Sequence, residues 1–539
     1  MMFLNFLLAL LPIIWLFIAF LGLKMPGYLG CLIALLIAIV ESIVLGMVNG
    51  GTSSELMLHG LNFSEAMTAT LEGVLGAVFP IAIIIIAAMF TYNLCVETRA
   101  MDRIKKMMTS VTNDKRMLVL ILAWGFGGFM EAVAGFGTAV AIPAAMMVAV
   151  GFDPMFSAVA CLLTNACNPT FGSIGIPTTT AGGLVADIIG GGDASVASAL
   201  IAGPAINMLA IPAFLSPFLV VLLTGKAMGK KNPLKGMLPF TLIAALTYVV
   251  PAMLIGNFVG AEFVDLVGNT LSLVAMIAAA KLMPPCTDPE WKMDLSVEED
   301  AGLNSIKFGT ATAWVPYILM LVLLIGTSKL VPVLNAPVNA VKSVFEVYSG
   351  PNPGKVSFSW FGNAGFLILI SGIIGGLCQH ASPATMGKVL VSTCKKMWKA
   401  IATIVFIIAV AKVMGYSGMT TSIAYLLAEL TGGFYAALAP VVGIIGTFVT
   451  GSTTSSGVLF AKMQTEVAEM IRAGDTPLKV SLVAANMAGG AIGKLISPQS
   501  IAVACAAIGL EGVDGKIMRK TVGYCVAFGV IVCIMSVIL

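Results

Sequence analysis

Long runs of apolar residues, separated by short polar stretches, recur from one end of the chain to the other. A helix needs about 20 apolar residues to cross the hydrocarbon core of a bilayer. Uncharged runs occupy 3–23, 73–94, 117–130, 201–224, 237–259, 310–325, 361–377, 400–411, 434–449 and 522–539. Together with the glycine- and proline-broken segments between them, the pattern predicts an all-α polytopic membrane protein with roughly 12 to 14 transmembrane helices.

The composition agrees with a membrane protein. The 539 residues are 59% hydrophobic and 10% charged, whereas soluble domains carry about 25% charged residues. The first apolar run, 3–23, lacks the basic start and small-residue cleavage site of a secretory signal, so we expect it to remain as a helix. The ten cysteines form no CxxC pair and lie mostly in apolar runs, which indicates packing rather than disulfides or metal binding.

Clusters of lysine and arginine set the expected orientation. They fall in three short loops, at 99–116, 226–235 and 388–399, and basic loops face the cytoplasm. The loop 49–62 contains no lysine or arginine and should face the opposite side. Counting back from the first basic loop places the amino terminus outside.

An internal repeat divides the chain into two halves. Residues of the same type recur 321 positions apart, in the pairs Gly125 and Gly446, Asn165 and Asn486, Gly172 and Gly493, and Pro177 and Pro498. We therefore expect a first transmembrane half at 1–283, a polar linker at 284–308 and a second transmembrane half at 309–539. Repeats with interrupted hydrophobic segments point to the binding sites of transporters.

Each half contains two apolar segments that glycine and proline should break. They lie near 125–143 and 164–177 in the first half, and near 446–464 and 486–498 in the second. Broken helices free backbone N–H and C=O groups, which are tolerated at membrane depth only inside protein or beside water. Half-helix N-termini can hold an anion there, and hydroxyl groups add donors at Ser452, Thr453, Thr454, Ser455 and Ser456. Close helix packing by small residues is the alternative interpretation.

Each half also carries one charge that the other half lacks. In the repeat, Glu131 aligns with Ser452, and Lys494 aligns with Ser173. An ionisable residue at the bilayer centre costs about 2.5 to 3.5 kcal/mol, so such residues are functional candidates. Lys494 could hold a substrate carboxylate, and Glu131 could take up a proton. Alternatively, the two residues form a structural ion pair, or Lys494 extends to the membrane interface.

The sequence lacks the motifs of two other classes of protein, ATP-driven pumps and enzymes. Gly489, Gly493 and Lys494 resemble part of a phosphate-binding loop, but the glycines are one residue too close and Leu495 follows the lysine. With only two histidines in the chain, no Ser-His-Asp or metal-ligand set is visible. We therefore expect neither an ATP-driven pump nor an enzyme, and we expect no cofactor and no metal.

Four stretches of the sequence resemble a known family. They are EAVAGFGTAVAI (131–142), FGSIGIP (171–177), TGSTTSSGVLFAKMQ (450–464) and GKLISPQSIAVACAAIGL (493–510), and they are similar to the bacterial L-lactate permease family. The resemblance implies uptake of lactate, and in relatives D-lactate or glycolate, in symport with protons across the bacterial inner (plasma) membrane. By analogy of fold, the wider superfamily implies inverted repeats, re-entrant hairpins and elevator-like motion.

Residues and resemblance together predict a secondary transporter of L-lactate. We expect Glu131 to carry the coupling proton, and we expect the substrate to be held by Lys494, Gly451, Ser452, Thr453, Thr454, Ser455, Ser456, Asn165, Asn486, Ser173 and Tyr416. Lys412 is either a second cation near the site or an interfacial residue. A sodium-coupled transporter of another small carboxylate and a passive anion channel are the alternatives. The expected partners are lactate, protons and membrane lipid without nucleic acid, and a homodimer is the assembly to test.

Overall fold

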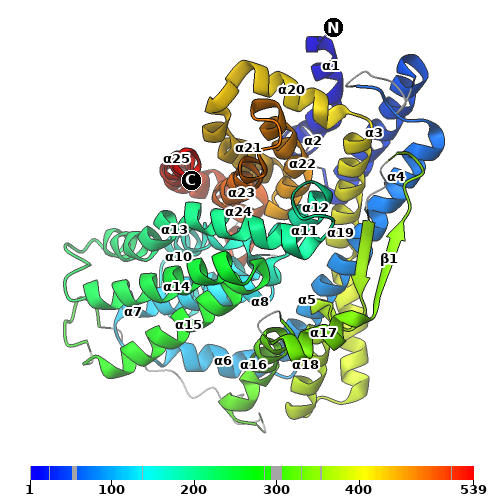
Figure 1. The fold of residues 1–539 in the computed structure, drawn as a ribbon. Coiled ribbons are helices and arrows are strands. Elements are labelled where there is room, and N and C mark those ends of the chain that lie inside the picture. Colours follow the sequence, from blue (N-terminus) through cyan, green and yellow to red (C-terminus); the bar gives the residue numbers. More distant parts are fainter. Residues whose placement is uncertain are drawn as a thin grey trace.

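The computed structural model describes residues 2–23, 25–50, 58–135, 137–284, 286–292, 306, 308–328, 331–351, 355–510 and 513–539 of the 539-residue chain. Most of the predicted linker 284–308 and part of the loop 49–62 therefore lie outside the described residues. The described chain consists of helices and a small two-stranded sheet (Figure 1). The all-α class predicted from the apolar runs is confirmed.

The first half of the chain supplies α1 to α15, with short π and 3₁₀ helices marked η. Their bounds are α1 (Met2–Ala9), α2 (Leu11–Phe17), η1 (Ile18–Gly22), α3 (Gly27–Asn49), α4 (Phe63–Gly76), η3 (Ala77–Ala82), α5 (Ile83–Glu97), α6 (Ala100–Thr109), α7 (Lys115–Val119), η4 (Leu120–Phe126), α8 (Gly127–Val133), α9 (Thr138–Ala149), α10 (Pro154–Thr164), η5 (Asn168–Thr170), α11 (Gly172–Leu184), α12 (Ala186–Ile189), α13 (Ala194–Ala227), α14 (Leu238–Phe258) and α15 (Ala261–Leu282).

The second half supplies α16 to α25 and the two strands. Their bounds are α16 (Thr310–Gly326), α17 (Pro332–Ala340), β1 (Lys342–Glu346), β2 (Lys355–Ser359), α18 (Ala364–Cys378), α19 (Pro383–Tyr416), α20 (Met419–Thr431), η7 (Gly432–Phe434), α21 (Tyr435–Thr450), α22 (Thr453–Ile471), α23 (Thr476–Gly493), α24 (Pro498–Ala507) and α25 (Asp514–Ile538).

Among the described residues, 10 helical segments are long and apolar enough to cross a membrane. Shorter apolar helices add Leu11–Phe20, Thr138–Ala149, Pro154–Thr164, Thr310–Gly326 and Ala364–Cys378. The predicted 12 to 14 spans fall between the long segments alone and the long and short segments together. The shorter helices include α9 and α10, which flank the first two interruptions described below.

Several helices begin where the sequence supplies both a cap and a proline. Asp153, Ser382 and Asp475 each accept a hydrogen bond from the backbone N–H three residues later, at the starts of α10, α19 and α23. A proline occupies one of the first two positions of each helix. It costs no hydrogen bond there, because a first-turn N–H group has no partner within the helix.

The two halves of the sequence pack into each other. The helices α3, α4 and α5 lie beside α18 and α19 on one side of the molecule (Figure 1). On the other side, α11 and α13 pack against α22 and α23. Both sets of contacts join segments that are far apart in the sequence, and the division of the chain at 284–308 stays a prediction.

The prediction of three basic loops is only partly right. Residues 388–399 lie inside α19, which no proline after Pro383 interrupts, and α6 occupies most of 99–116, so these two basic clusters are largely helical. Arg116 of the first loop donates from Nη1 to the backbone carbonyls of Pro233 (3.0 Å) and Lys235 (2.9 Å) in the second. Thr98, next to the first loop, donates to Gln379 Oε1 (2.6 Å), which lies shortly before the third. This shared face is the one that the positive-inside rule assigns to the cytoplasm.

The hairpin of β1 and β2 was not predicted from the sequence. Its strands are antiparallel, and Phe345 and Phe358 pack against Phe79 of η3 with ring centroids 5.7 and 5.5 Å apart. The available signal was alternation of polar and apolar residues on either side of a stretch rich in glycine and proline. The hairpin therefore lies over α4 and η3 (Figure 1).

Candidate functional site

Four interruptions of the helices bring most of the predicted site residues together, with Tyr416 as the exception. They separate α8 from α9 at 134–137, α10 from α11 at 165–171, α21 from α22 at 451–452, and α23 from α24 at 494–497. Each lies inside one of the four segments predicted to be broken. A further interruption within α11 gives Ser173, Ile174 and Gly175 left-handed backbone conformations, with φ of 48°, 59° and 73°.

The two interruptions of the first half touch each other. Ser173 Oγ donates to the backbone carbonyl of Ala134 at 3.1 Å. Gly135, with φ of 59°, faces the same hydroxyl so closely that a Cβ there would lie 2.0 Å from Ser173 Oγ. Glycine is required at this position by both its conformation and its neighbour.

The helix α24 links the interruptions of the two halves. A Cβ at Gly451 would lie 2.0 Å from Gln499 Oε1, and one at Gly137 would lie 3.1 Å from Val503 Cγ1. Gln499 and Val503 are one turn apart on α24, so the break at 134–137 and the break at 451–452 lie against neighbouring turns of one helix. Lys494 precedes this helix in the fourth interruption.

Glu131 and Lys494 form an ion pair where the interruptions meet. The Nζ atom of Lys494 lies 3.0 Å from Oε1 of Glu131, and the two side chains are 16% and 3% exposed. Asn165 Nδ2 donates to the other carboxylate oxygen at 3.4 Å. One of the two arrangements left open for these charges, an ion pair, is therefore the one that the structure contains, and Lys494 does not extend away from Glu131.

Gly172 provides the space for the Glu131 carboxylate. A Cβ on Gly172 would lie 2.7 Å from Oε1 and 2.9 Å from Cγ of Glu131. Both contacts are shorter than van der Waals distance, so any larger residue at 172 would displace the carboxylate from Lys494.

The hydroxyl groups at the start of α22 are largely used in packing. Thr453 Oγ1 donates to the carbonyl of Gly490 (3.3 Å), and Ser456 Oγ donates to the carbonyl of Gly443 (3.1 Å). Ser452 caps the helix by accepting a hydrogen bond from the N–H of Ser455. Thr454 is buried as well. These contacts fix the N-terminus of α22 between α21 and α23.

Asn486 lies next to the interruption that carries Asn165. Its Oδ1 accepts a hydrogen bond from Gln464 Nε2 at 3.4 Å. The neighbouring residue, Met487, accepts a hydrogen bond through its carbonyl from Thr170 Oγ1 at 2.9 Å. The segments that bear the two repeat-related asparagines are therefore in contact.

Tyr416 and Lys412 belong to a second charged cluster. Lys412 Nζ lies 2.6 Å from Oε1 of the fully buried Glu72, and Tyr416 donates from its hydroxyl to both Glu72 oxygens, at 3.0 and 3.1 Å. Lys462 of α22 donates to the carbonyl of Gly415 at 2.9 Å. Thr453 and Lys462 are about 14 Å apart along α22 at 1.5 Å per residue. Tyr416 therefore lies away from the N-terminus of α22, and Lys412 pairs with Glu72 rather than with an interface.

The sequence analysis missed Glu72 and Lys462. Glu72 lies directly before the apolar run that begins at residue 73, so it was counted as the edge of a span rather than as a charge inside one. The helix α4 continues through this position, and Glu72 is 0% exposed. Isolated charges at the ends of apolar runs are the signal that could have identified both residues.

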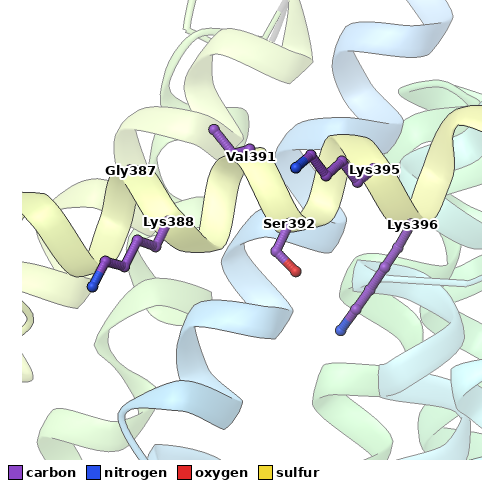
Figure 2. Close-up of a pocket in the computed structure, with 6 residues that line it drawn as sticks. All are labelled: Gly387, Lys388, Val391, Ser392, Lys395 and Lys396. Atoms are coloured by element: carbon purple, nitrogen blue, oxygen red, sulfur yellow. The ribbon is translucent and has the colours of Figure 1, made fainter.

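A surface hollow of ≈ 590 Å³ lies elsewhere, along α19. Figure 2 shows its six lining residues, all on this one helix: Gly387, Lys388, Val391, Ser392, Lys395 and Lys396. They include three lysines of the basic cluster 388–399, which lies within this helix. A hollow formed by one helix on the basic face lacks the convergence of several helices seen at Glu131 and Lys494, so we place the candidate site at the ion pair.

The fold and the interruptions with charged residues define a multi-pass α-helical membrane protein with the features of a transporter. A solved structure has the same overall fold: the YdaH transporter of Alcanivorax borkumensis, described as having an unusual topology, with a TM-score of 0.50, 13% sequence identity, and coverage of 94% of this chain and 97% of that chain. The chain belongs to the L-lactate permease family, whose model matches residues 5–539.

Individual relatives agree with this assignment. The L-lactate permease of Streptococcus iniae is 36% identical over 470 residues, which cover 86% of this chain and 90% of the relative. The L-lactate permease of Escherichia coli (strain K12) is 31% identical, with 99% and 95% covered. Glycolate permease GlcA of the same strain is also 31% identical, with 99% and 95% covered. The family resemblance predicted from the sequence is confirmed, and the chain is a multi-pass protein of the bacterial inner membrane.

Proposed function

We propose that this protein is a secondary active transporter that imports L-lactate in symport with protons. The observation that carries the proposal is the Lys494–Glu131 ion pair, because a cation and an acid from different halves meet where the helices are interrupted. Membership of the L-lactate permease family supports lactate as the cargo, and the similarity to a glycolate permease supports a small 2-hydroxy acid more generally. The relatives are permeases, and the proposal includes no enzymatic activity.

The ion pair gives lactate and the proton a common binding step. A lactate carboxylate that binds Lys494 Nζ competes with Glu131 Oε1 for the same ammonium group. Glu131 is then buried without a cation, and such a carboxylate favours its protonated form. Proton and lactate thus favour the same loaded state, which is the requirement for coupling. Since a proton and a lactate anion carry no net charge together, the loaded site is as neutral as the ion pair alone.

The 2-hydroxyl group of lactate has candidate partners beside the pair. Within the described chain, Asn165 Oδ1 has no hydrogen-bond partner, while its amide nitrogen contacts Glu131. Asn165 can therefore accept from a hydroxyl next to the carboxylate that binds Lys494. We assign supporting roles to Asn486, Ser173 and the N-terminus of α22 at 451–456. Tyr416 would contact the substrate from the second charged cluster, at a different point of its route through the protein.

A sodium-coupled transporter of another small carboxylate and a passive channel are the competing functions. Uptake of labelled L-lactate into proteoliposomes separates them when a pH gradient and a sodium gradient are imposed in separate experiments. We expect the pH gradient alone to drive accumulation above the outside concentration. Equilibration without accumulation would identify a channel. Accumulation driven by the sodium gradient alone would identify sodium, in place of the proton, as the driving ion. Whether the protein acts as a homodimer is a separate prediction.

The Glu131→Gln variant tests the proton carrier in the same vesicles. Glutamine keeps the volume and removes the titrating group, so uptake should no longer respond to the pH gradient, while exchange of internal for external lactate continues. If this variant still concentrates lactate under a pH gradient alone, Glu131 does not carry the proton. Thr98→Val, which changes a hydrogen bond on the basic face, is the control and should keep proton-driven uptake.

A further inference from the structure

Asp265 is a carboxylate buried in the protein without a counterion in the described chain. It is 0% exposed, and Tyr248 donates from its hydroxyl to Oδ1 at 2.8 Å. The second oxygen, Oδ2, has no hydrogen-bond partner among the described residues, and no ion pair there involves Asp265. An isolated charge at membrane depth is unfavourable, so this carboxylate requires either a proton or a cation.

Two asparagine amides that also lack hydrogen-bond partners among the described residues lie near Asp265. Asn269 follows Asp265 by one turn of α15 and therefore lies on the same helix face. A Cβ on Gly128 would lie 2.1 Å from Asn269 Oδ1 and 3.1 Å from Asn168 Nδ2, so both amides meet at the backbone of α8. Both side chains are at most 1% exposed, and neither the oxygen nor the nitrogen of either amide has a partner in the part of the chain that the structure describes.

The preceding residue ties Asn168 to Asp265. The Cys167 thiol is close enough to the Asp265 carboxylate to interact with it electrostatically. The carboxylate on α15, the amide one turn later and the amide in the 165–171 interruption therefore lie near one another. The two amides fit against α8 because Gly128 has no side chain that would occupy the same space.

The chemistry of this cluster favours a metal cation over a proton. Three oxygens lack partners among the described residues: Asp265 Oδ2, Asn168 Oδ1 and Asn269 Oδ1. A proton on Asp265 supplies a single donor, which can satisfy one amide oxygen. A hard monovalent cation can take several oxygens as ligands, and carboxylate and amide oxygens are the ligands that hard cations prefer. With one carboxylate, a single positive charge neutralises the cluster.

We propose that Asp265, Asn168 and Asn269 form a sodium-binding site. The proposal goes beyond the sequence analysis, which expected no metal. The site shares the 165–171 interruption with Asn165, which contacts Glu131, so bound sodium would hold in place the segment that presents Asn165 to the substrate site. The ordering effect on substrate binding rests on the proposed lactate transport, whereas sodium binding itself does not.

The test is direct binding of radioactive sodium to the purified full-length protein in detergent, by equilibrium dialysis without lactate. We expect saturable binding in the wild type and none in Asp265→Asn. The thermal unfolding midpoint should rise when sodium chloride replaces choline chloride at constant ionic strength, and Asp265→Asn should remove the rise. Asn269→Ala, which keeps the carboxylate, should weaken sodium binding at least tenfold and provides the answer if Asp265→Asn fails to fold.

Asp193→Asn is the matched control, because it makes the same chemical change at an exposed helix cap where asparagine also functions. It should bind sodium as the wild type does. Binding that survives in Asp265→Asn and Asn269→Ala would overturn the proposal, and so would a midpoint that responds to pH but not to sodium. Neither result depends on lactate uptake, so failure of this site and failure of the proposed transport can be told apart.

Discussion

At the scale of single residues, each of Glu131 and Lys494 accounts for the burial of the other's charge. Either charge alone would be costly at membrane depth, and together they form a neutral pair with a 3.0 Å contact. The residues are 363 positions apart in the sequence. Their residue types and apolar surroundings made both predictable as candidates. Their contact was one of several alternatives, because no local pattern encodes which distant residues meet.

Removal of one partner of this pair should lower stability and transport together. Lys494→Ala leaves the Glu131 carboxylate buried without a cation, which costs about 3–5 kcal/mol when a buried pair is broken from one side. The double variant Lys494→Ala/Glu131→Ala should recover much of that stability and still fail to transport, because the carboxylate-binding group is absent. Thermal unfolding in detergent and lactate uptake measure the two effects separately.

The pair of Lys479 and Glu469 supplies the control for this experiment. Its atoms are 2.6 Å apart, but Glu469 is 48% exposed, and exposed pairs contribute about 0–1 kcal/mol. Lys479→Ala should therefore change stability little and leave uptake intact. Wild-type uptake by well-folded Lys494→Ala would show that Lys494 does not hold the substrate carboxylate.

At the scale of elements, the interruptions of the helices were the most predictable part of the site. Glycine and proline act on their own backbone, so their effect is legible in a short stretch of sequence. The breaks at 173–175 and 494–497 occupy equivalent repeat positions, whereas those at 134–137 and 451–452 are offset by a few residues. What the sequence did not predict depends on packing between distant elements: the Glu72–Lys412 pair, the β1–β2 hairpin and the amide cluster around Asp265.

The interruption between α21 and α22 should tolerate no side chain at Gly451. Its φ is 74°, which costs a residue with a side chain about 1–2 kcal/mol, and a Cβ there would lie 2.8 Å from the Cβ of Gln499. The Gln499 Cβ cannot move aside without α24. Gly451→Ala should therefore lose more stability than the left-handed conformation alone explains, and it should reduce lactate uptake.

Gly474→Ala isolates the conformational part of this effect. Gly474 has nearly the same φ, 76°, and a Cβ added there would meet nothing within 4 Å. Gly474→Ala should therefore lose only the stability that the left-handed backbone conformation costs, and lactate uptake should be preserved. Equal losses of stability in the two variants, measured by thermal unfolding, would mean that α24 does not pack against the break as described.

At the scale of the whole molecule, the start of the polar linker is fastened to the basic face. Asn113 and Cys286 exchange two hydrogen bonds, at 3.0 and 3.2 Å, between the first basic loop and the described part of the linker. The Arg116 guanidinium lies over the indole ring of Trp291, 4.6 Å from the ring centroid. Glu290 forms an ion pair with Lys230 of the second basic loop at 3.0 Å. The linker therefore begins on the same side of the membrane as the lysine-rich loops.

This arrangement predicts on which side, and at what pH, Cys286 reacts. A membrane-impermeant thiol reagent should modify it in inside-out vesicles and leave it unmodified in right-side-out vesicles, as read by mass spectrometry. Burial, followed by the nearby Asp114 carboxylate, raises the pKa of the Cys286 thiol above its ordinary value of 9.0. The thiolate is the reactive form, so its fraction is small at neutral pH and the labelling rate should still be rising with pH at pH 9.0, the ordinary thiol pKa.

Cys394, exposed on α19 among the lysines of 388–399, is the internal reference for sidedness. It should be modified from the same side as Cys286, because the contact of Thr98 with Gln379 places the start of α19 beside the first basic loop. Modification of Cys286 in right-side-out vesicles would place the basic loops and the linker outside, and would reverse the orientation of the whole protein. Opposite sidedness for the two cysteines would instead contradict the contact that places Gln379, shortly before α19, beside Thr98 at the first basic loop.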